Sequence, residues 1–205
     1  MTRHQCVFTI HFEKNSSTRF SIFASTHKKT SKLKIFKLLF FLDFTHFKET
    51  GKSVTNLNYY AWEHGPIPKD FFVELKEAQG PPQDFKKFLT IYGFTSDFNN
   101  KSGELFGAKT GPNMRVFSPR EQRIIKELCY IYKDLDAQDM SEITHLKNTP
   151  WDQTKKTKGL HQPIDYLLAL DEDAKISKEE AIEALESRKE MLESFPPLPR
   201  LANEG

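Results

Sequence analysis

Apolar residues recur at helical spacing between Ser31 and Thr50, and this stretch is the strongest element that the sequence predicts. It stops at Gly51, which is typical of a helix C-terminus because glycine adopts the left-handed conformation at little cost. On a helical wheel, the apolar side holds Phe36, Leu39, Phe40 and Phe47. The opposite side is expected to be a solvent stripe of Lys34, Lys37, Thr45 and Lys48. Phe41 lies inside that stripe.

Asp43 lies in the middle of the apolar side of this helix, with His46 one turn further along. An ionised carboxylate is costly to bury unless polar partners surround it. We therefore expect Asp43 and His145 to be buried polar groups that tie neighbouring elements together.

The stretch YYAWEHGPIP, residues 59–68, predicts a bend between two elements. An extended segment is expected over residues 56–61, followed by a corner. Gly65 precedes Pro66, and the residue before a proline is disfavoured in a helix. Pro68 fits the first turn of the helix that follows, where a missing N–H costs nothing.

Capping residues predict the helices in the second half of the chain. Ser118 and Thr149 are each followed by a proline and then by an acidic residue, which is typical of a helix N-terminus. Asp136 is expected to cap a shorter helix that runs through His145. Ser177 opens the last helix, which cannot continue into the proline-rich end of the chain.

The remaining segments carry weaker patterns. Residues 1–17 indicate a short strand or an irregular arm, and residues 20–24 a short helix. Residues 85–92 fit a helix, whereas residues 105–109 and 114–117 fit a small hairpin. The predicted fold is mainly α, a single compact helical domain of about five to seven helices with a short β-hairpin or extended segments.

Composition predicts a core filled by aromatic rings and does not by itself point to a nucleic-acid partner. The chain has 205 residues, enough for one ordinary domain, and 18 of them are phenylalanine. Its formal net charge is +2, which does not require a nucleic-acid partner. The most basic stretch, residues 28–37, leaves a DNA-binding autoregulator open as an alternative, although a solvated helix entry is the favoured interpretation.

The two cysteines, Cys6 and Cys129, lie far apart and make neither a disulfide framework nor a zinc site. They favour a reduced, cytoplasmic location. No signal peptide is evident, and the most apolar run, residues 35–42, is too short to span a bilayer.

Catalytic motifs are not evident in the sequence. It contains no paired-cysteine or His-Glu-x-x-His metal motif, no Gly-x-Ser-x-Gly elbow and no glycine-rich phosphate loop. We therefore expect a protein without catalytic residues, metal or cofactor. A metal-dependent hydrolase that uses Asp43, His46 and His145 remains an alternative. The bend around His145 and Trp151 is expected to be structural, with His145 a candidate partner for the indole N–H.

Two separated stretches together resemble one family. Residues 32–68, KLKIFKLLFFLDFTHFKETGKSVTNLNYYAWEHGPIP, resemble the signature half of the Panacea domain of SocA-like antitoxins. A second stretch runs from the FSPREQRIIKEL segment to Pro150-Trp151. The family signature falls on Lys37, Asp43, Trp62, Gly65, Pro66, His145, Pro150 and Trp151. Met140 departs from the family pattern, which has a leucine there.

The resemblance implies an antitoxin of a bacterial or phage toxin–antitoxin system. It places the Panacea domain at residues 18–157, with an N-terminal arm before it and a C-terminal helical extension with a proline-rich tail at residues 158–205. It implies a cognate toxin as partner, encoded by the adjacent gene, and delivery of the toxin to an AAA+ protease as a further role. No membrane partner is expected and nucleic acid is disfavoured.

Three aromatic residues are candidate partner contacts: Phe41, Tyr59 and Tyr60. Adjacent side chains of an extended segment point to opposite faces, so one tyrosine is expected to face the core and the other outward. An exposed tyrosine is a good interface anchor.

Overall fold

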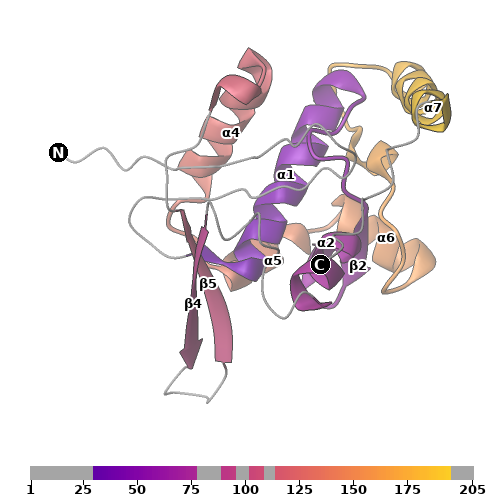
Figure 1. Cartoon of the computed structure of the whole chain (residues 1–205). Helices are drawn as coiled ribbons and strands as arrows, with labels where there is room; N and C mark the ends of the chain where they lie inside the picture. The colour runs from indigo at the N-terminus through magenta and orange to yellow at the C-terminus, as the bar shows by residue number, and fades with distance from the viewer. Residues whose placement is uncertain (1–29, 78–88, 96–101, 109–113, 195–205) are drawn as a thin grey trace.

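A computed structural model describes residues 30–77, 89–95, 102–108 and 114–194 of the chain (Figure 1). Its α-helices are α1 (Lys32–Thr50), α2 (Lys69–Glu77), α4 (Pro119–Ile131), α5 (Ala137–Thr144), α6 (Pro150–Lys158) and α7 (Lys178–Ser194). Short 3-10 turns, η1 (Met114–Val116) and η2 (Tyr166–Ala169), accompany them. The strands are β1 (Thr30–Ser31), β2 (Tyr59–Trp62), β3 (Gly65–Pro68), β4 (Leu89–Thr95) and β5 (Ser102–Ala108). The mainly α prediction is confirmed. The elements predicted for residues 1–17 and 20–24 lie outside the described residues.

Helix α1 has the predicted limits because local groups satisfy both of its ends. The Ser31 side chain accepts a hydrogen bond from the Lys34 N–H and caps the N-terminus. Gly51 is left-handed, with φ of 69°, and its N–H donates to the Phe47 carbonyl at 2.8 Å. A side chain on Gly51 would also collide with α7, since its Cβ would lie 2.9 Å from that of Ala184.

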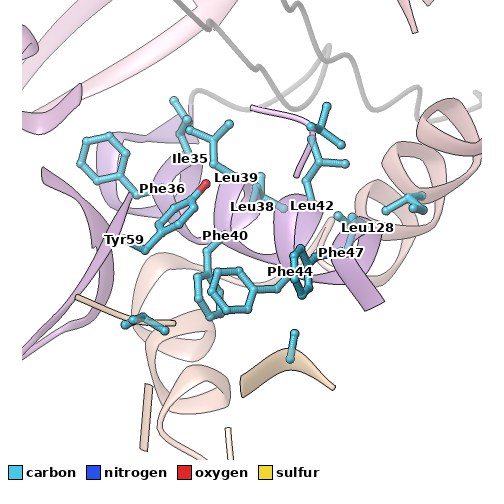
Figure 2. Close-up of a cluster of buried hydrophobic side chains, with 14 of the residues drawn as sticks. Ile35, Phe36, Leu38, Leu39, Phe40, Leu42, Phe44, Phe47, Tyr59 and Leu128 are labelled. Atoms are coloured by element: carbon cyan, nitrogen blue, oxygen red, sulfur yellow. The ribbon is translucent and has the colours of Figure 1, made fainter. Parts of the chain in front are cut away.

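Helix α1 is the centre of the fold, and other elements surround it on several sides (Figure 1). The buried cluster in Figure 2 consists largely of its aromatic and aliphatic side chains, together with Tyr59 and Leu128. The predicted solvent stripe is therefore wrong in part: Lys37 is fully buried and Phe41 is half-buried. A helix that is enclosed by its neighbours is apolar on more than one side.

The predicted corner at Trp62 is a β-hairpin. Strands β2 and β3 pair antiparallel, with Tyr59 opposite Pro68 and Trp62 opposite Gly65. Residues 161–164 flank the other side of β2, where the Ile164 N–H donates to the Tyr59 carbonyl at 2.8 Å. Strand β2 is thus held on both edges.

Residues 89–92, predicted as part of a helix over residues 85–92, belong instead to a second hairpin, and residues 85–88 lie outside the described residues. Strand β4 pairs antiparallel with β5, and β5 also pairs with β1, so the strand order is β1-β5-β4. The predicted hairpin partner at residues 114–117 is instead largely the 3-10 turn η1. A short apolar run has no periodicity that separates strand from helix, so its long-range pairing decides the outcome.

The capping predictions for the second half are confirmed. Ser118 and Glu121 form a capping box on α4, and Asp136 caps α5, which ends with His145 as its C-cap. Thr149 caps α6, and Ser177 exchanges hydrogen bonds with Glu180 at the start of α7. No helix in the described part of the chain is long and apolar enough to cross a membrane.

The segment after α6 packs onto α1. Tyr166 of η2 stacks against Phe44, with ring centroids 4.5 Å apart. The Lys175 N–H donates to the Lys48 carbonyl at 2.9 Å, and Ala181 of α7 is fully buried. The described residues after 158 therefore contribute to the same core as α1.

Candidate functional site

The carboxylate of Asp43 is the best-satisfied buried polar group on α1. Oδ1 accepts the backbone N–H groups of Val54 and Thr55 at 2.8 and 2.7 Å. Oδ2 accepts the Tyr59 hydroxyl at 2.8 Å and the Thr55 hydroxyl. These donors come from the loop after α1 and from β2, so the carboxylate fixes both to the helix. The prediction that Asp43 is a buried tie is confirmed.

Groups from the C-terminal part of the chain close this site. The Tyr166 hydroxyl donates to the Leu57 carbonyl at 2.7 Å, and its oxygen lies 3.5 Å from Oδ2 of Asp43. Arg188 of α7 donates to the Ser53 hydroxyl at 3.3 Å. Burial lowers the pKa of Arg188, and the electrostatic influence of Tyr166 and then of Asp43 opposes that shift.

Burial raises the pKa of Asp43 to about 6, against the hydrogen bonds from Thr55, Tyr59 and Val54, which favour the ionised form. The carboxylate is therefore mostly ionised at neutral pH. The pKa of Tyr59 lies well above its usual value, first because the ring is buried and then because Asp43 is negative. Tyr59 therefore keeps its proton and stays a donor.

Lys37 is the second buried charged residue of α1. Its side chain is fully buried, and Nζ donates to the Pro66 carbonyl of β3 at 3.1 Å. Burial lowers the pKa of Lys37 to about 7. The amine therefore fixes the β2–β3 hairpin to α1 at a cost in solvation.

Gly65 allows the β2–β3 hairpin to lie close to α1 and α5. Its φ is +95°, and a Cβ there would lie 2.5 Å from Oγ1 of Thr144 and 2.6 Å from Nζ of Lys37. Any side chain here would force the Lys37 and Thr144 side chains, or the hairpin itself, to move. Glycine is required here both for its backbone conformation and for the space.

Trp151 joins the hairpin to α6. Its indole Nε1 donates to the Trp62 carbonyl at 2.8 Å, so the prediction that His145 is its hydrogen-bond partner is wrong. His145 instead stacks on the indole, with centroids 3.8 Å apart and planes 23° apart. Burial, followed by the nearby positive charge of Lys37, lowers the pKa of His145. A neutral imidazole packs well against an aromatic ring. The bend between α5 and α6 is therefore held by the His145–Trp151 stack and by the hydrogen bond from Trp151 to the Trp62 carbonyl.

The structure does not bring the proposed hydrolase residues together. Nδ1 of His46 lies 2.7 Å from the Lys52 carbonyl, Asp43 faces β2, and His145 lies on Trp151. Among the residues that the structure describes, no three His, Cys, Asp or Glu side chains are arranged to hold a metal ion.

The described part of the basic stretch begins at Thr30. Its lysine side chains contact other parts of the protein. Lys37 is buried, Lys34 donates to the backbone carbonyls of Lys133 and Leu135, and Lys32 lies over the Phe72 ring. A phosphate-binding surface needs solvent-facing cations on one side. These lysines do not form such a surface.

The three candidate partner contacts occupy different environments. Tyr59 is only 1% exposed and belongs to the core, so it does not reach a partner, whereas the neighbouring Tyr60 is half-buried. This agrees with the expectation that only one of the two faces the core. The half-buried Phe41 stacks on Tyr132, with ring centroids 4.9 Å apart and planes 14° apart.

Sequence reasoning missed the exposed apolar side chains near the ends of α4 and α5. Tyr130 is 74% exposed, Ile131 59% and Leu146 60%. Ile131 lies at helical spacing from the buried Ile124 and Leu128, so helical periodicity alone would place it in the core. Helix α4 ends at this residue, and nothing in the local sequence marks it as exposed.

These observations describe a mainly helical domain whose described core contains buried charged ties and no assembled metal centre. The family model described as "Antitoxin SocA-like, Panacea domain" matches residues 35–152, more than half of the chain. The chain belongs to this family of antitoxin-like proteins. No curated protein and no solved structure matches the chain at a significant level.

The matched region contains every family-signature residue named above. Lys37 touches Pro66 directly, a Cβ on Gly65 would reach Lys37, and Trp151 touches both Trp62 and His145. Asp43 forms a separate tie on the same helix. Apart from Asp43 and Pro150, the signature residues therefore make contacts in one junction, where the β2–β3 hairpin meets α1, α5 and α6.

Proposed function

We propose that this chain is the antitoxin of a bacterial or phage toxin–antitoxin pair and that it neutralises its toxin by direct binding in the cytoplasm. The family match over residues 35–152 carries the proposal. The junction described above supports it, since a binding surface that is already ordered avoids the conformational-entropy cost of becoming ordered on binding.

The contacts with the toxin are part of this proposal. Tyr60 and Phe41 keep part of their surface exposed, and Lys69 lies over the Tyr60 ring at 5.3 Å. The exposed Tyr130 and Ile131 directly precede Tyr132 in the sequence, and they add apolar surface to that of the Phe41–Tyr132 stack. Tyrosine and other large apolar side chains are frequent anchors of protein interfaces.

Co-expression with the product of the adjacent gene tests the proposal. We expect the neighbour to arrest growth when it is expressed alone, and growth to recover when this chain is present. The two proteins should then co-purify. A neighbour that is harmless alone, or that stays toxic beside the well-folded chain, would contradict the proposal.

The same experiment separates blocking from delivery to an AAA+ protease. Blocking leaves the amount of toxin unchanged, whereas delivery lowers it and depends on an active protease. Toxin abundance is therefore measured by immunoblot in strains with and without each major AAA+ protease. A Gly65→Ala variant, expected to disturb the junction, tests whether rescue depends on the intact domain.

A further inference from the structure

Helix α7 touches the rest of the described fold along one narrow stripe. Among its described side chains, Ala181 is buried, Ala184, Leu185 and Arg188 are half-buried, and the others are exposed. These four residues follow the spacing i, i+3, i+4 and i+7, which places them on one face of the helix. Helix α1, by contrast, buries most of its side chains. Two alanines and one leucine bury little apolar surface, so the hydrophobic effect holds α7 only weakly.

The apolar part of the stripe lies against the C-terminal end of α1, at the edge of the molecule (Figure 1). A Cβ on Gly51 would lie 2.9 Å from the Cβ of Ala184 and 3.4 Å from the Cα of Ala181. The glycine and the two alanines therefore allow the two backbones to approach closely. A contact between such small residues contributes little free energy, because few apolar atoms are removed from water.

Ion pairs join the segment before α7 to the same end of α1. Nζ of Lys175 lies 2.7 Å from Oε1 of Glu49, and Nζ of Lys48 lies 2.7 Å from Oδ1 of Asp171. Each pair has one side chain that is more than half exposed, so water screens the attraction and the pair adds little to stability. Burial raises the pKa of Glu49 and of Asp171, but the hydrogen bonds that they accept outweigh it and hold both pKa values below the ordinary value. Both carboxylates therefore stay ionised at mildly acidic pH.

Arg188 ends the stripe and connects α7 to the loop that follows α1. Its Nη1 donates to the Ser53 hydroxyl at 3.3 Å, and the same loop supplies two backbone N–H groups to the carboxylate of Asp43. The charge of Asp43 is one of the influences that favour the protonated guanidinium against its burial, after that of Tyr166. This attraction exists only while the carboxylate is ionised.

We propose that α7 is a clasp that leaves the rest of the fold as a unit, and that Arg188 couples its docking to the charge on Asp43. Helix α7 lies beyond residue 152, where the family match ends, so the match does not account for this contact. The clasp is a property of the fold and holds whether or not the chain neutralises a toxin. An isolated helix of 17 residues has little stability in water, so α7 loses its hydrogen bonds when it undocks.

The other groups around Asp43 stay in place when α7 leaves. They come from the loop after α1, from β2 and from η2, and they are Thr55, Tyr59 and Tyr166. The solvation of the carboxylate therefore changes little, and undocking mainly removes the positive charge of Arg188. Protonation of Asp43 removes the same attraction from the other side. Below the pKa of Asp43, about 6, α7 is thus held less firmly than above it.

Hydrogen exchange of the full chain tests the clasp. Protection factors, corrected for the intrinsic effect of pH on exchange, are measured for the amides of α7 and of α1. We expect α7 to be less protected than α1 by about tenfold or more, with little dependence on low concentrations of urea, because its opening is local. If α7 and α1 show equal protection and equal dependence on urea, α7 unfolds only with the whole domain and the clasp is wrong.

Arg188→Gln and Lys189→Gln are matched variants that test the coupling. Arg188 lies on the stripe, whereas the Lys189 side chain is 78% exposed. At about pH 7.5, Arg188→Gln should lower the protection of α7 by about threefold to tenfold and leave that of α1 unchanged, whereas Lys189→Gln should change neither. At about pH 5, where Asp43 is mostly protonated, Arg188→Gln should have a much smaller effect.

The comparison of the wild type with Arg188→Gln at both pH values isolates Asp43 from other titrating groups. Histidines also titrate in this range, and His46 contacts the same loop through the Lys52 carbonyl. Their effects are common to both proteins and cancel. The coupling is overturned if Arg188→Gln has no effect at neutral pH, if its effect is equal at both pH values, or if Lys189→Gln has an equal effect.

Discussion

The Tyr59 hydroxyl donates a 2.8 Å hydrogen bond to Oδ2 of Asp43, and both side chains are buried from solvent. The tyrosine comes from β2 and the carboxylate from α1. The bond therefore links the hairpin to the central helix at a point where water cannot replace it. The contribution of such a bond to the free energy of unfolding comes mainly from the cost of leaving its buried partner unsatisfied.

Tyr59→Phe removes this donor and keeps the ring. We expect the free energy of unfolding at pH 7 to fall by roughly 1 to 3 kcal/mol, since a buried charged acceptor loses a partner. The pKa of Asp43 should rise further, because the Tyr59 hydrogen bond lowers it. Urea denaturation measures the stability, and Tyr60→Phe, at the half-buried neighbouring position, is the control. Equal losses in the two variants would contradict the account.

Asp43 makes stability depend on pH in a defined direction. Its pKa is about 6 in the folded chain, above the ordinary value of 3.8, so between these values the folded state binds a proton that the unfolded state releases. The stabilisation it contributes at low pH is lost as the pH rises through 6. The stability of the wild type relative to Asp43→Asn should therefore fall by roughly 1 to 3 kcal/mol between pH 4 and 7. Unfolding curves across that range check it, and a constant difference would show that Asp43 has an ordinary pKa.

Gly65 and Gly159 form a natural comparison. Both have a positive φ, +95° and +94°, but only at Gly65 would an added Cβ have atoms within 4 Å, those of Thr144 and Lys37. We expect Gly65→Ala to lower the free energy of unfolding by roughly 3 kcal/mol or more, and Gly159→Ala by roughly 1 kcal/mol from backbone strain alone. Thermal denaturation of both variants measures the difference. Similar losses would mean that space around Gly65 does not matter.

Lys37 should make the free energy of unfolding depend on pH above neutrality. Its pKa of about 7 in the fold lies below the ordinary 10.5, so between these values the unfolded chain binds a proton that the folded chain does not. The wild type should therefore gain stability relative to Lys37→Met as the pH rises from about 7 to about 9.5. A stability difference between the two proteins that stays constant over this pH range would contradict the assignment.

Phe41 and Tyr132 should stabilise the fold as a pair. Each is half-buried and their rings stack, so we expect each alanine variant to cost roughly 1 to 3 kcal/mol. A double-mutant cycle should give a coupling of roughly 0.5 to 1.5 kcal/mol. Toxin affinity is measured on the same folded variants. Unchanged stability with weakened binding in Phe41→Ala would mean that Phe41 acts only at the partner surface.

Much of the fold was predictable because its signals are local. The limits of α1 follow from Ser31 and Gly51, and α4 and α5 begin where Ser118 and Asp136 satisfy free backbone N–H groups. Burial of Asp43 was also predictable, since its wheel position surrounds it with apolar residues. The family signature was recognisable in the same stretch of chain.

The sequence by itself determined where the helices start and stop, the mainly α class and the family, because caps, glycines and helical periodicity act within a few residues. Tertiary structure alone decided that Lys37 is buried against Pro66, that Trp151 bonds the Trp62 carbonyl, and that Tyr59 rather than Tyr60 faces the core. It also decided that β4 pairs with β5. These outcomes depend on which distant segments pack against α1 and against each other, and a helical wheel or a short apolar run carries no information about them.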